Sequence, residues 1–535
     1  MFFVFPGPLA PPETPMALVS RFSSVSDSGS PPRNQSLILP YPYSASYTMP
    51  MFISPTTNFQ YEFYMDRYFT QVLGIQYRLA DQKALRSIMN FLAQQNPAVK
   101  SSISLLSVLH IQSQAHAAAS SSGVAGLLPA PQSAQKLYDR LYEQTRKLLQ
   151  ESKLFKQGRL DEGDAMACLH LISAFLFSGG RGTWWEFLDT AGDWVEATIR
   201  EYGESPHLAL LGLSERGRFI FRATMWMDVF SGVSLCRPPR FLCWYQQLFR
   251  PGVSLPEELG MERIMGCPND VILAFAETAQ LEHDKQCETA ACTTTTTTTD
   301  GSGSGNGNGD ENGNCVGSAE ANMMLEYMLR TRGMQIETYI PEVSGPVPLP
   351  SWERFVELKD TEDGSTVAEI AERDTRMKVA EVFKQAARVY LHSVIEGCDP
   401  QVPTIRRAVL ASIHALTVRV SYFNARALQH PFNLLFALQA LHSSPLDRAL
   451  IFPITITGCL AATQAEVDFC LARLANVGND ANSFGNCLQA RELIHEVWAK
   501  RIAVGIDASG VPVKSQPINW RIVMRELGED PLLLV

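Results

Sequence analysis

The sequence has no excess of positive charge and no pair of cysteines separated by two residues. Its 535 residues carry 45 Lys and Arg against 55 Asp and Glu, which gives a formal net charge of −10. Surfaces that bind nucleic acids concentrate basic side chains, so this balance argues against a chain whose whole surface binds DNA, although a small basic module remains compatible with it. Without closely spaced cysteine pairs, we do not expect a structural zinc site.

Long hydrophobic runs are also missing. The best candidate for a membrane span, residues 449–463, is shorter than the roughly 18 residues required and contains Pro453. The apolar start Met1–Phe5 has no basic residue before it and is cut by Pro6, so we do not expect a signal peptide. The 11 cysteines then belong in a reducing compartment, where most of them are small core residues.

Motifs of catalysis and cofactor binding are missing as well. Neither the Gly-x-Ser-x-Gly pentapeptide of serine hydrolases nor a phosphate-binding loop occurs, and the glycine-rich run 301–309 lies in low-complexity sequence. Cys287 and Cys292 are the closest cysteines, and no second pair accompanies them. Three lone histidines lie in helical patterns, as core or boundary residues usually do: His392, His414 and His495. We therefore expect no enzyme and no catalytic, cofactor-binding, metal-binding or DNA-binding residue.

One segment is locally basic. Between Lys136 and Arg159 the chain carries seven basic and three acidic residues. A solvated helix face is the favoured interpretation, and a surface that contacts phosphate is the alternative.

Two segments have a composition typical of disorder and divide the chain. Residues 1–56 are rich in Pro and Ser, and residues 288–320 contain seven consecutive threonines, a Gly/Ser/Asn run and no basic residue. We interpret the first as disordered and the second as a flexible linker. They would separate an N-terminal helical lobe, 57–287, from a C-terminal helical lobe, 321–535, and the two lobes could still form one continuous body.

The remaining sequence shows helical periodicity. An apolar stripe with spacings of three and four predicts a long helix that ends at Gly397: Val379, Phe383, Ala386, Tyr390 and Val394. Thr183 and Glu186 have the spacing of a capping box, which predicts a second helix start. No stretch alternates regularly between apolar and polar residues. We therefore predict an all-α fold, a large multi-helix bundle or superhelix.

Several segments, taken in order, carry a resemblance to a known family: Tyr64–Tyr77, 182–191, Phe219–Val229, Ile264–Cys267, Phe383–Ile395, Phe452–Ala461 and Trp520–Gly528. The most specific is the Pro-x-x-x-x-Gly-Cys element that starts at Pro453. Together they resemble the regulatory domain of fungal-specific transcription factors over about residues 57–535. The resemblance implies a nuclear regulator of RNA polymerase II transcription that acts through a helical regulatory domain.

The chain departs from that family at its N-terminus. Members contact DNA through a cluster in which six cysteines hold two zinc ions, whereas the first cysteine here is Cys168. Residues 1–56 contain only two basic residues, Arg21 and Arg33, so no basic arm replaces the cluster. We therefore expect no zinc cofactor in this chain, and we expect DNA contact to come from missing upstream exons or from a partner chain.

Other hypotheses remain open. The chain could be a helical protein-interaction scaffold without DNA binding, and an enzyme is the weakest of the three hypotheses. The expected partners are the transcription machinery or another regulator, and a homodimer and a small-molecule effector are left open. No effector pocket can be assigned from the sequence. Trp184, Trp226 and Phe452 could line one, but aromatic residues at helical spacing are usually core, and we expect these to be core.

Overall fold

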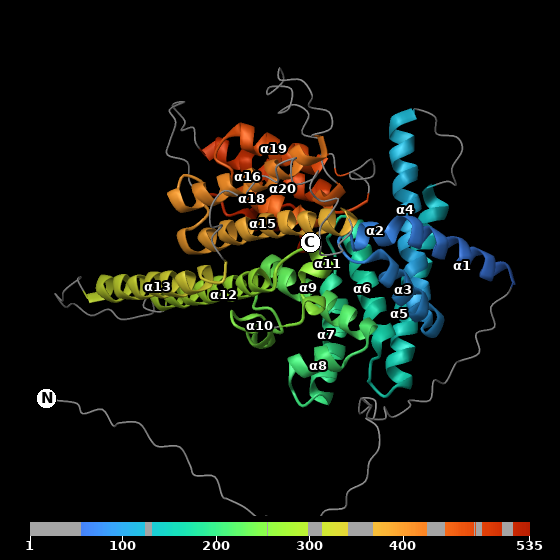
Figure 1. Cartoon of the computed structure of the whole chain (residues 1–535). Helices are drawn as coiled ribbons and strands as arrows, with labels where there is room; N and C mark the ends of the chain where they lie inside the picture. Colours follow the sequence, from blue (N-terminus) through green and yellow to red (C-terminus); the bar gives the residue numbers. More distant parts are fainter. Residues whose placement is uncertain are drawn as a thin grey trace, which may run out of the picture. The chain divides into compact units, whose positions relative to one another are not determined.

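The computed structural model is helical wherever it describes the chain. It describes residues 55–122, 131–253, 255–297, 313–340, 367–424, 445–475, 477, 484–504 and 517–535. None of these residues lies in a strand (Figure 1), which confirms the predicted all-α, multi-helix fold. No helix in these ranges is long and apolar enough to cross a membrane. Apart from its last two residues, the Pro- and Ser-rich segment 1–56 lies outside the described residues.

The elements before residue 300 are α1 (Pro55–Arg67), the π-helix η1 (Tyr68–Val72), α2 (Leu73–Gln76), α3 (Gln82–Gln95), α4 (Pro97–Ser122), α5 (Pro131–Phe155), α6 (Glu162–Phe177), α7 (Trp184–Glu201), α8 (Pro206–Gly212), α9 (Glu215–Leu235), α10 (Leu242–Phe249), the 3₁₀ turn η2 (Glu257–Leu259), α11 (Glu262–Met265) and α12 (Asn269–Thr297). The elements after it are α13 (Gly313–Glu337), α15 (Val367–Glu396), α16 (Pro403–Asn424), the 3₁₀ turn η4 (Pro445–Leu450), α18 (Ile451–Cys459), α19 (Gln464–Ala475), α20 (Cys487–Val504) and α21 (Trp520–Glu526).

Local sequence sets many of the helix ends. The long helix predicted from the stripe at 379–394 is α15, and it ends before Gly397, whose φ of +86° suits glycine. Helix α7 begins at Trp184 as predicted, but the predicted capping box is wrong, because the Thr183 side chain makes no capping hydrogen bond. A capping box does occur at α6, where the side chains of Asp161 and Asp164 each accept from the other's backbone N–H.

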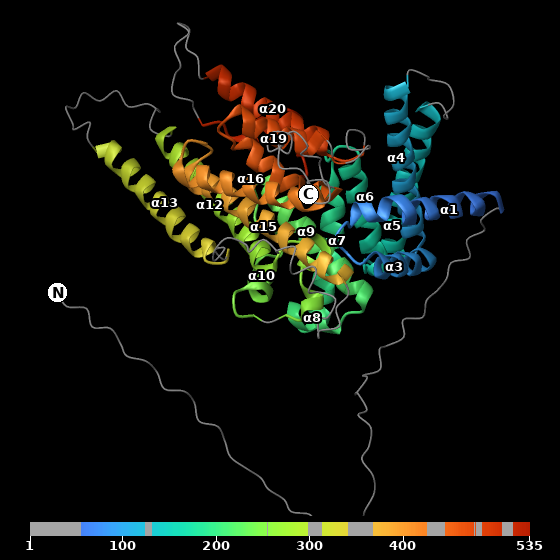
Figure 2. The ribbon, with the colours of Figure 1, turned by 45° about the horizontal axis from the view of Figure 1, so that its top comes forward.

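The predicted linker 288–320 is helical at both ends. Helix α12 continues to Thr297 and α13 begins at Gly313, so only residues 298–312 lie outside the described residues. Helices α12 and α13 lie side by side in both views (Figures 1 and 2). The described residues on either side of the linker belong to one compact unit, 52–535, and to one hydrophobic cluster.

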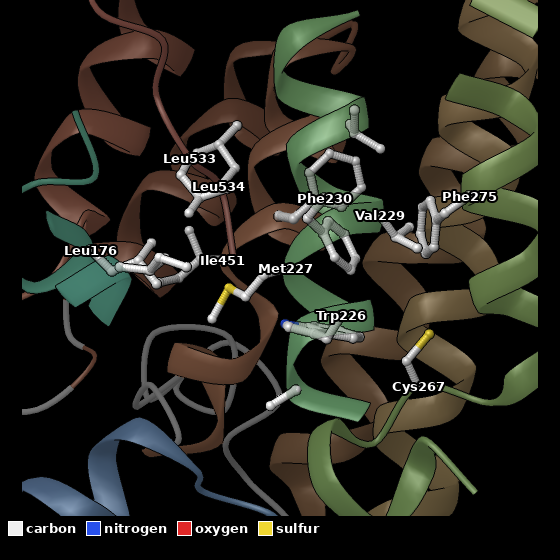
Figure 3. Packing of buried hydrophobic residues seen from close by; sticks show 14 of the residues in the cluster. Leu176, Trp226, Met227, Val229, Phe230, Cys267, Phe275, Ile451, Leu533 and Leu534 are labelled. Atoms are coloured by element: carbon white, nitrogen blue, oxygen red, sulfur yellow. The ribbon is translucent and has the colours of Figure 1, made fainter. Parts of the chain in front are cut away.

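Helix α9 runs through the middle of this cluster. Every residue from Phe219 to Ser234 is buried, which is the environment of a helix that is apolar nearly all round. Met227 points toward Leu176 of α6 and Ile451 of α18, and Val229 points toward Phe275 of α12 (Figure 3). Helix α9 therefore joins elements that are far apart in the sequence.

The three aromatic residues considered for an effector pocket are core residues. Trp184, Trp226 and Phe452 are at most 3% exposed. Trp226 packs against Phe230 on its own helix and Phe383 of α15, with ring centroids 4.5 and 5.6 Å away. The prediction that all three are core is confirmed.

Candidate functional site

A partly enclosed cavity of about 80 Å³ lies beside α9. Its walls come from α2, α6, α9, α11, η4 and α18, and most of them are apolar. Leu176, Met227 and Ile451 converge on this region from three different helices (Figure 3). The volume exceeds that needed for a single water molecule, so the cavity can hold several waters or a small organic group.

Polar groups gather at one end of this cavity. The side-chain amide of Gln76 donates to Ser173 Oγ at 2.8 Å, and Tyr68 donates its hydroxyl hydrogen to Gln76 Oε1 at 2.8 Å. Tyr77 Oη lies 3.3 Å from the same amide nitrogen. Gln76, Tyr77 and Ser173 all line the cavity. An apolar cavity with a few convergent polar groups is the usual form of a small-molecule site.

His170 supports that polar end from behind. Its two ring nitrogens lie 2.9 Å from Ser102 Oγ and 3.3 Å from Tyr68 Oη. Burial lowers the pKa of His170 to about 3, so the ring is neutral at physiological pH. His170 and Ser102 are fully buried, and neither is among the described residues that line this cavity.

Trp226 lines the cavity and is only 3% exposed. Its indole nitrogen is buried and has no hydrogen-bond partner among the described residues. Such a group costs roughly 1–3 kcal/mol when it stays unpaired. Within the described residues, the cavity therefore combines a mostly apolar lining that includes Trp226 with the polar end at Gln76 and Ser173.

A second, wider cavity of about 240 Å³ adjoins the first. Phe177 and Gly485 line both cavities and therefore form the wall between them. The Gly485 N–H donates to the Phe177 carbonyl at 3.0 Å, and Phe177 stacks on Phe484 with centroids 4.2 Å apart. The second cavity has a more polar lining, which includes Gln112, His116 and Gln489.

The last residues of the chain lie against the same wall. The Leu533 N–H donates to the Gly180 carbonyl at 2.8 Å, and the Asn486 side chain donates to the Leu533 carbonyl at 2.7 Å. Residues 532–534 are almost fully buried, and Val535 lines the first cavity. This segment ties the ends of α6 and α20 together beside the cavity.

A buried ion pair joins α21 to the core. Arg521 lies 2.6 Å from the Glu282 carboxylate of α12, and Tyr390 of α15 donates to that carboxylate at 2.9 Å. Arg521 Nε also donates to the Val233 carbonyl of α9 at 3.2 Å. Burial and the Glu282 charge raise the pKa of Tyr390 well above its usual value, so its hydroxyl keeps its proton and donates. The group acts as a structural clamp among four helices.

The residues that the sequence singled out for chemistry stay apart. His392 lies 3.5 Å from Glu337, and burial lowers the pKa of its ring. His414 and His495 line neither cavity. Cys287 Sγ lies 3.6 Å from His283, and the side chain of Cys292 is outside the described residues.

The donor set does not fit a binuclear zinc cluster. Such a cluster needs six cysteines in closely spaced pairs, whereas the described cysteines are widely separated in sequence and mostly buried. In the part of the chain that the structure describes, no three His, Cys, Asp or Glu side chains are grouped so that they could hold a metal ion.

The basic segment between Lys136 and Arg159 has the features of a solvated helix face. On α5, Arg146 pairs with Glu143 and Lys147 with Glu151, all on the surface. Lys156 differs, because it lies 2.7 Å from the fully buried carboxylate of Asp164. All seven basic side chains of this segment are thus exposed or paired with nearby acids.

Sequence reasoning missed the polar end of the cavity. A signal was present, because His170 and Ser173 interrupt the otherwise apolar run of α6. Their partners could not be read from local spacing, since Tyr68 and Gln76 lie 102 and 97 residues earlier in the chain.

Comparison with known proteins places this fold in a family. The model described as "Fungal specific transcription factor domain" matches residues 62–534. A curated relative, the trichothecene biosynthesis transcription regulator TRI10 of Trichoderma arundinaceum, is 22% identical over 156 residues, which cover 29% of this chain and 30% of that protein. No solved structure matches the chain significantly. Because the family match spans nearly all of the described helices, the chain belongs to the fungal-specific transcription factor domain family.

Proposed function

We propose that the protein regulates RNA polymerase II transcription in the nucleus through this helical domain. The observation that carries the proposal is the family match over residues 62–534. The relative named as a trichothecene biosynthesis transcription regulator adds support over a shorter stretch. Its partners would be the transcription machinery or another regulator. Contact with DNA would come from a module outside the described helices or from a partner chain, because this sequence contains no closely spaced cysteine pair.

We further propose that the cavity beside Trp226 is the effector site of the domain. Its occupant would be a small, largely apolar molecule that packs against Trp226 and the other apolar side chains of the lining. The polar end at Gln76 and Ser173 would fix its orientation. Because the cavity is lined by α9 and by elements on both sides of the predicted linker, a ligand there would stabilise their packing.

A role without catalysis fits the chemistry of the lining. Ser173 is the only serine there, and its hydroxyl donates to the Leu169 carbonyl at 2.9 Å and accepts from Gln76, with no base against it. Among the described residues of the lining, no side chain is a carboxylate or a thiol. A nucleophile needs an adjacent base or a lowered pKa, and Ser173 has neither.

The test is to delete the gene in its native host, measure transcripts, and map chromatin occupancy of the tagged endogenous protein. The proposal predicts a defined set of transcripts whose levels change and whose promoters the protein occupies. Unchanged transcripts, or a protein excluded from the nucleus under every condition tested, would contradict it.

A further inference from the structure

Helix α13 presents an apolar stripe to solvent. Met323, Tyr327 and Met334 are 71%, 69% and 63% exposed, and Arg330 completes the row. The spacings of four, three and four residues place these side chains on one face of the helix. The row runs over twelve residues, from Met323 to Met334, or about 16 Å of helix. Soluble proteins rarely leave such a continuous apolar row uncovered, which indicates an interaction surface.

The opposite face of α13 is held in place. Leu329 and Ile336 are buried, and Arg332 forms an ion pair with Asp284 of α12. A Cβ at Gly333 would lie only 2.2 Å from Ile395 of α15, so the two helices approach closely there. Figure 2 shows α13 alongside α12 at the margin of the helices. The exposed row therefore sits on a fixed helix.

The spacing of the exposed row is symmetric, and its two outer residues are both methionine. Met323 and Met334 lie at equal distances from the midpoint between residues 328 and 329, and so do Tyr327 and Arg330. In a two-fold symmetric contact, if residue i meets residue j of the partner, then j also meets i. An antiparallel pair of α13 helices centred on this midpoint places methionine against methionine. The same register places the Arg330 guanidinium over the Tyr327 ring of the second copy, which is a favourable cation–π pair.

Charge favours the same register. The first part of α13, up to Met328, contains the acids Glu320 and Glu326 and no basic residue, whereas the following turn contains Arg330. Glu326 and Arg330 form an exposed ion pair within the helix at 2.8 Å. Antiparallel pairing brings each Glu326 within about one turn of Arg330 in the second copy, so the acidic half of one helix faces the basic half of the other.

We propose that the exposed row Met323–Met334 is a self-association surface, and that its occupant is the same row of a second copy in antiparallel register. The row ends at Met323 and Met334, so the contact covers about three turns of the helix. A contact of this length is smaller than a standard interface, so the expected affinity is weak, in the micromolar range.

The first test is sedimentation of the full chain across a concentration series. Arg330→Glu removes the cation over the Tyr327 ring and brings the new carboxylate close to Glu326 of the second copy. It is expected to weaken self-association about tenfold. The double exchange Glu326→Arg with Arg330→Glu restores opposite charges and is expected to recover most of the affinity. Phe155→Ser is the matched control, because Phe155 is 64% exposed on α5 and lies off the row. Circular dichroism verifies that each variant keeps its helix content.

The second test reads the register directly. In the antiparallel pair, position 323 faces position 334 of the second copy, whereas the two positions 323 lie about 16 Å apart along the axis, too far for a disulfide. Met323→Cys mixed with Met334→Cys is therefore expected to give a cross-linked dimer, while either variant alone is not. The linked peptides are identified by mass spectrometry, with the unmodified chain oxidised in parallel because Cys243 and Cys287 are exposed.

Two results would overturn the proposal. One is a chain that stays monomeric at all concentrations, or a self-association that Arg330→Glu leaves unchanged. The other is efficient cross-linking of Met323→Cys with itself, which would place the helices in parallel register.

Discussion

Helices α9 and α13 both carry apolar side chains on several faces, but these side chains differ in how far they are buried. All residues of α9 from Phe219 to Ser234 are buried, whereas Met323, Tyr327 and Met334 of α13 are largely exposed. In α9 the partners for every face come from this chain, as Figure 3 shows for Leu176, Ile451 and Phe275. In α13 they come from this chain on one face only. Apolar side chains on every face of a helix thus indicate that each face packs against something. They do not show whether the same chain or a second chain provides the packing partner.

The polar groups on the two helices differ in the same way. Asp228 of α9 is buried and accepts from the Tyr245 hydroxyl at 2.7 Å and from the backbone N–H groups of Arg240 and Phe241. The ion pair of Glu326 and Arg330 on α13 is exposed, and such pairs contribute about 0.5 kcal/mol or less. Substitutions in the two helices should therefore have effects of very different size.

The largest expected loss of stability comes from a substitution that leaves a cavity beside α9. Phe230→Ala removes a ring that lies about 5 Å from those of Phe275 and Phe452, and it should lower the free energy of unfolding by about 4 kcal/mol. Tyr327→Ala is the matched change on α13 and should lower it by about 0.5 kcal/mol at most. Urea unfolding of dilute protein measures both. Similar losses in the two variants would mean that α13 is covered within one chain.

Breaking the buried ion pair of Arg521 and Glu282 should lower the stability of the fold somewhat less. Arg521→Ala leaves the Glu282 carboxylate buried without its cation and should destabilise the fold by about 3 kcal/mol. Arg330→Ala removes the exposed counterpart on α13 and should change the stability of the dilute chain by less than about 0.5 kcal/mol. Thermal unfolding of the two variants gives the comparison, and an Arg521→Ala chain as stable as the parent would rule out the clamp.

A pH effect should follow from the buried histidine behind the cavity. Burial lowers the pKa of His170 from 6.5 to about 3, so the unfolded chain takes up a proton that the folded chain does not. The stabilising contribution is complete above pH 6.5 and is lost as the pH falls toward 3, by about 1.4 kcal/mol for each pH unit. Unfolding measured between pH 7 and pH 5 should show this slope, and His170→Gln should reduce it. An equal slope in the variant would place the proton uptake elsewhere.

The smallest effect should come from Trp226→Phe. The change removes a buried N–H that has no partner among the described residues, so stability should change by less than about 1 kcal/mol. Effector binding should weaken, because the smaller phenyl ring packs against less of the ligand. Ligand-induced thermal stabilisation measures this, and a ligand that stabilises both forms equally would not be held by the indole.

Much of the fold was accessible from the sequence because helices are local structures. The spacing of Val379, Phe383 and Tyr390 located α15, and Gly397 marked its end. The helix start at Trp184 was found for a partly wrong reason, because the Thr183 side chain turns out not to cap. The helical ends of the linker were missed, since threonine and glycine are poor helix formers and the composition there is typical of a flexible segment.

The candidate site could not be predicted from the sequence, because its residues are brought together only by folding. Gln76 and Ser173 lie 97 residues apart, and no local pattern shows that they meet. Trp226 was correctly expected to be core, but its unpaired N–H depends on which atoms surround it after folding. The symmetric spacing of the α13 row is present in the sequence, yet it suggests a two-fold contact only once the row is known to face solvent.

The central claim is that this domain alters transcription when it is brought to a promoter. The direct measurement fuses the full chain to an unrelated DNA-binding domain and records reporter RNA in a fungal host. The account predicts a change in reporter RNA that Arg521→Ala weakens by destabilising the domain, while Phe155→Ser leaves it intact. A folded, nuclear fusion that occupies the promoter without changing reporter RNA would contradict the account.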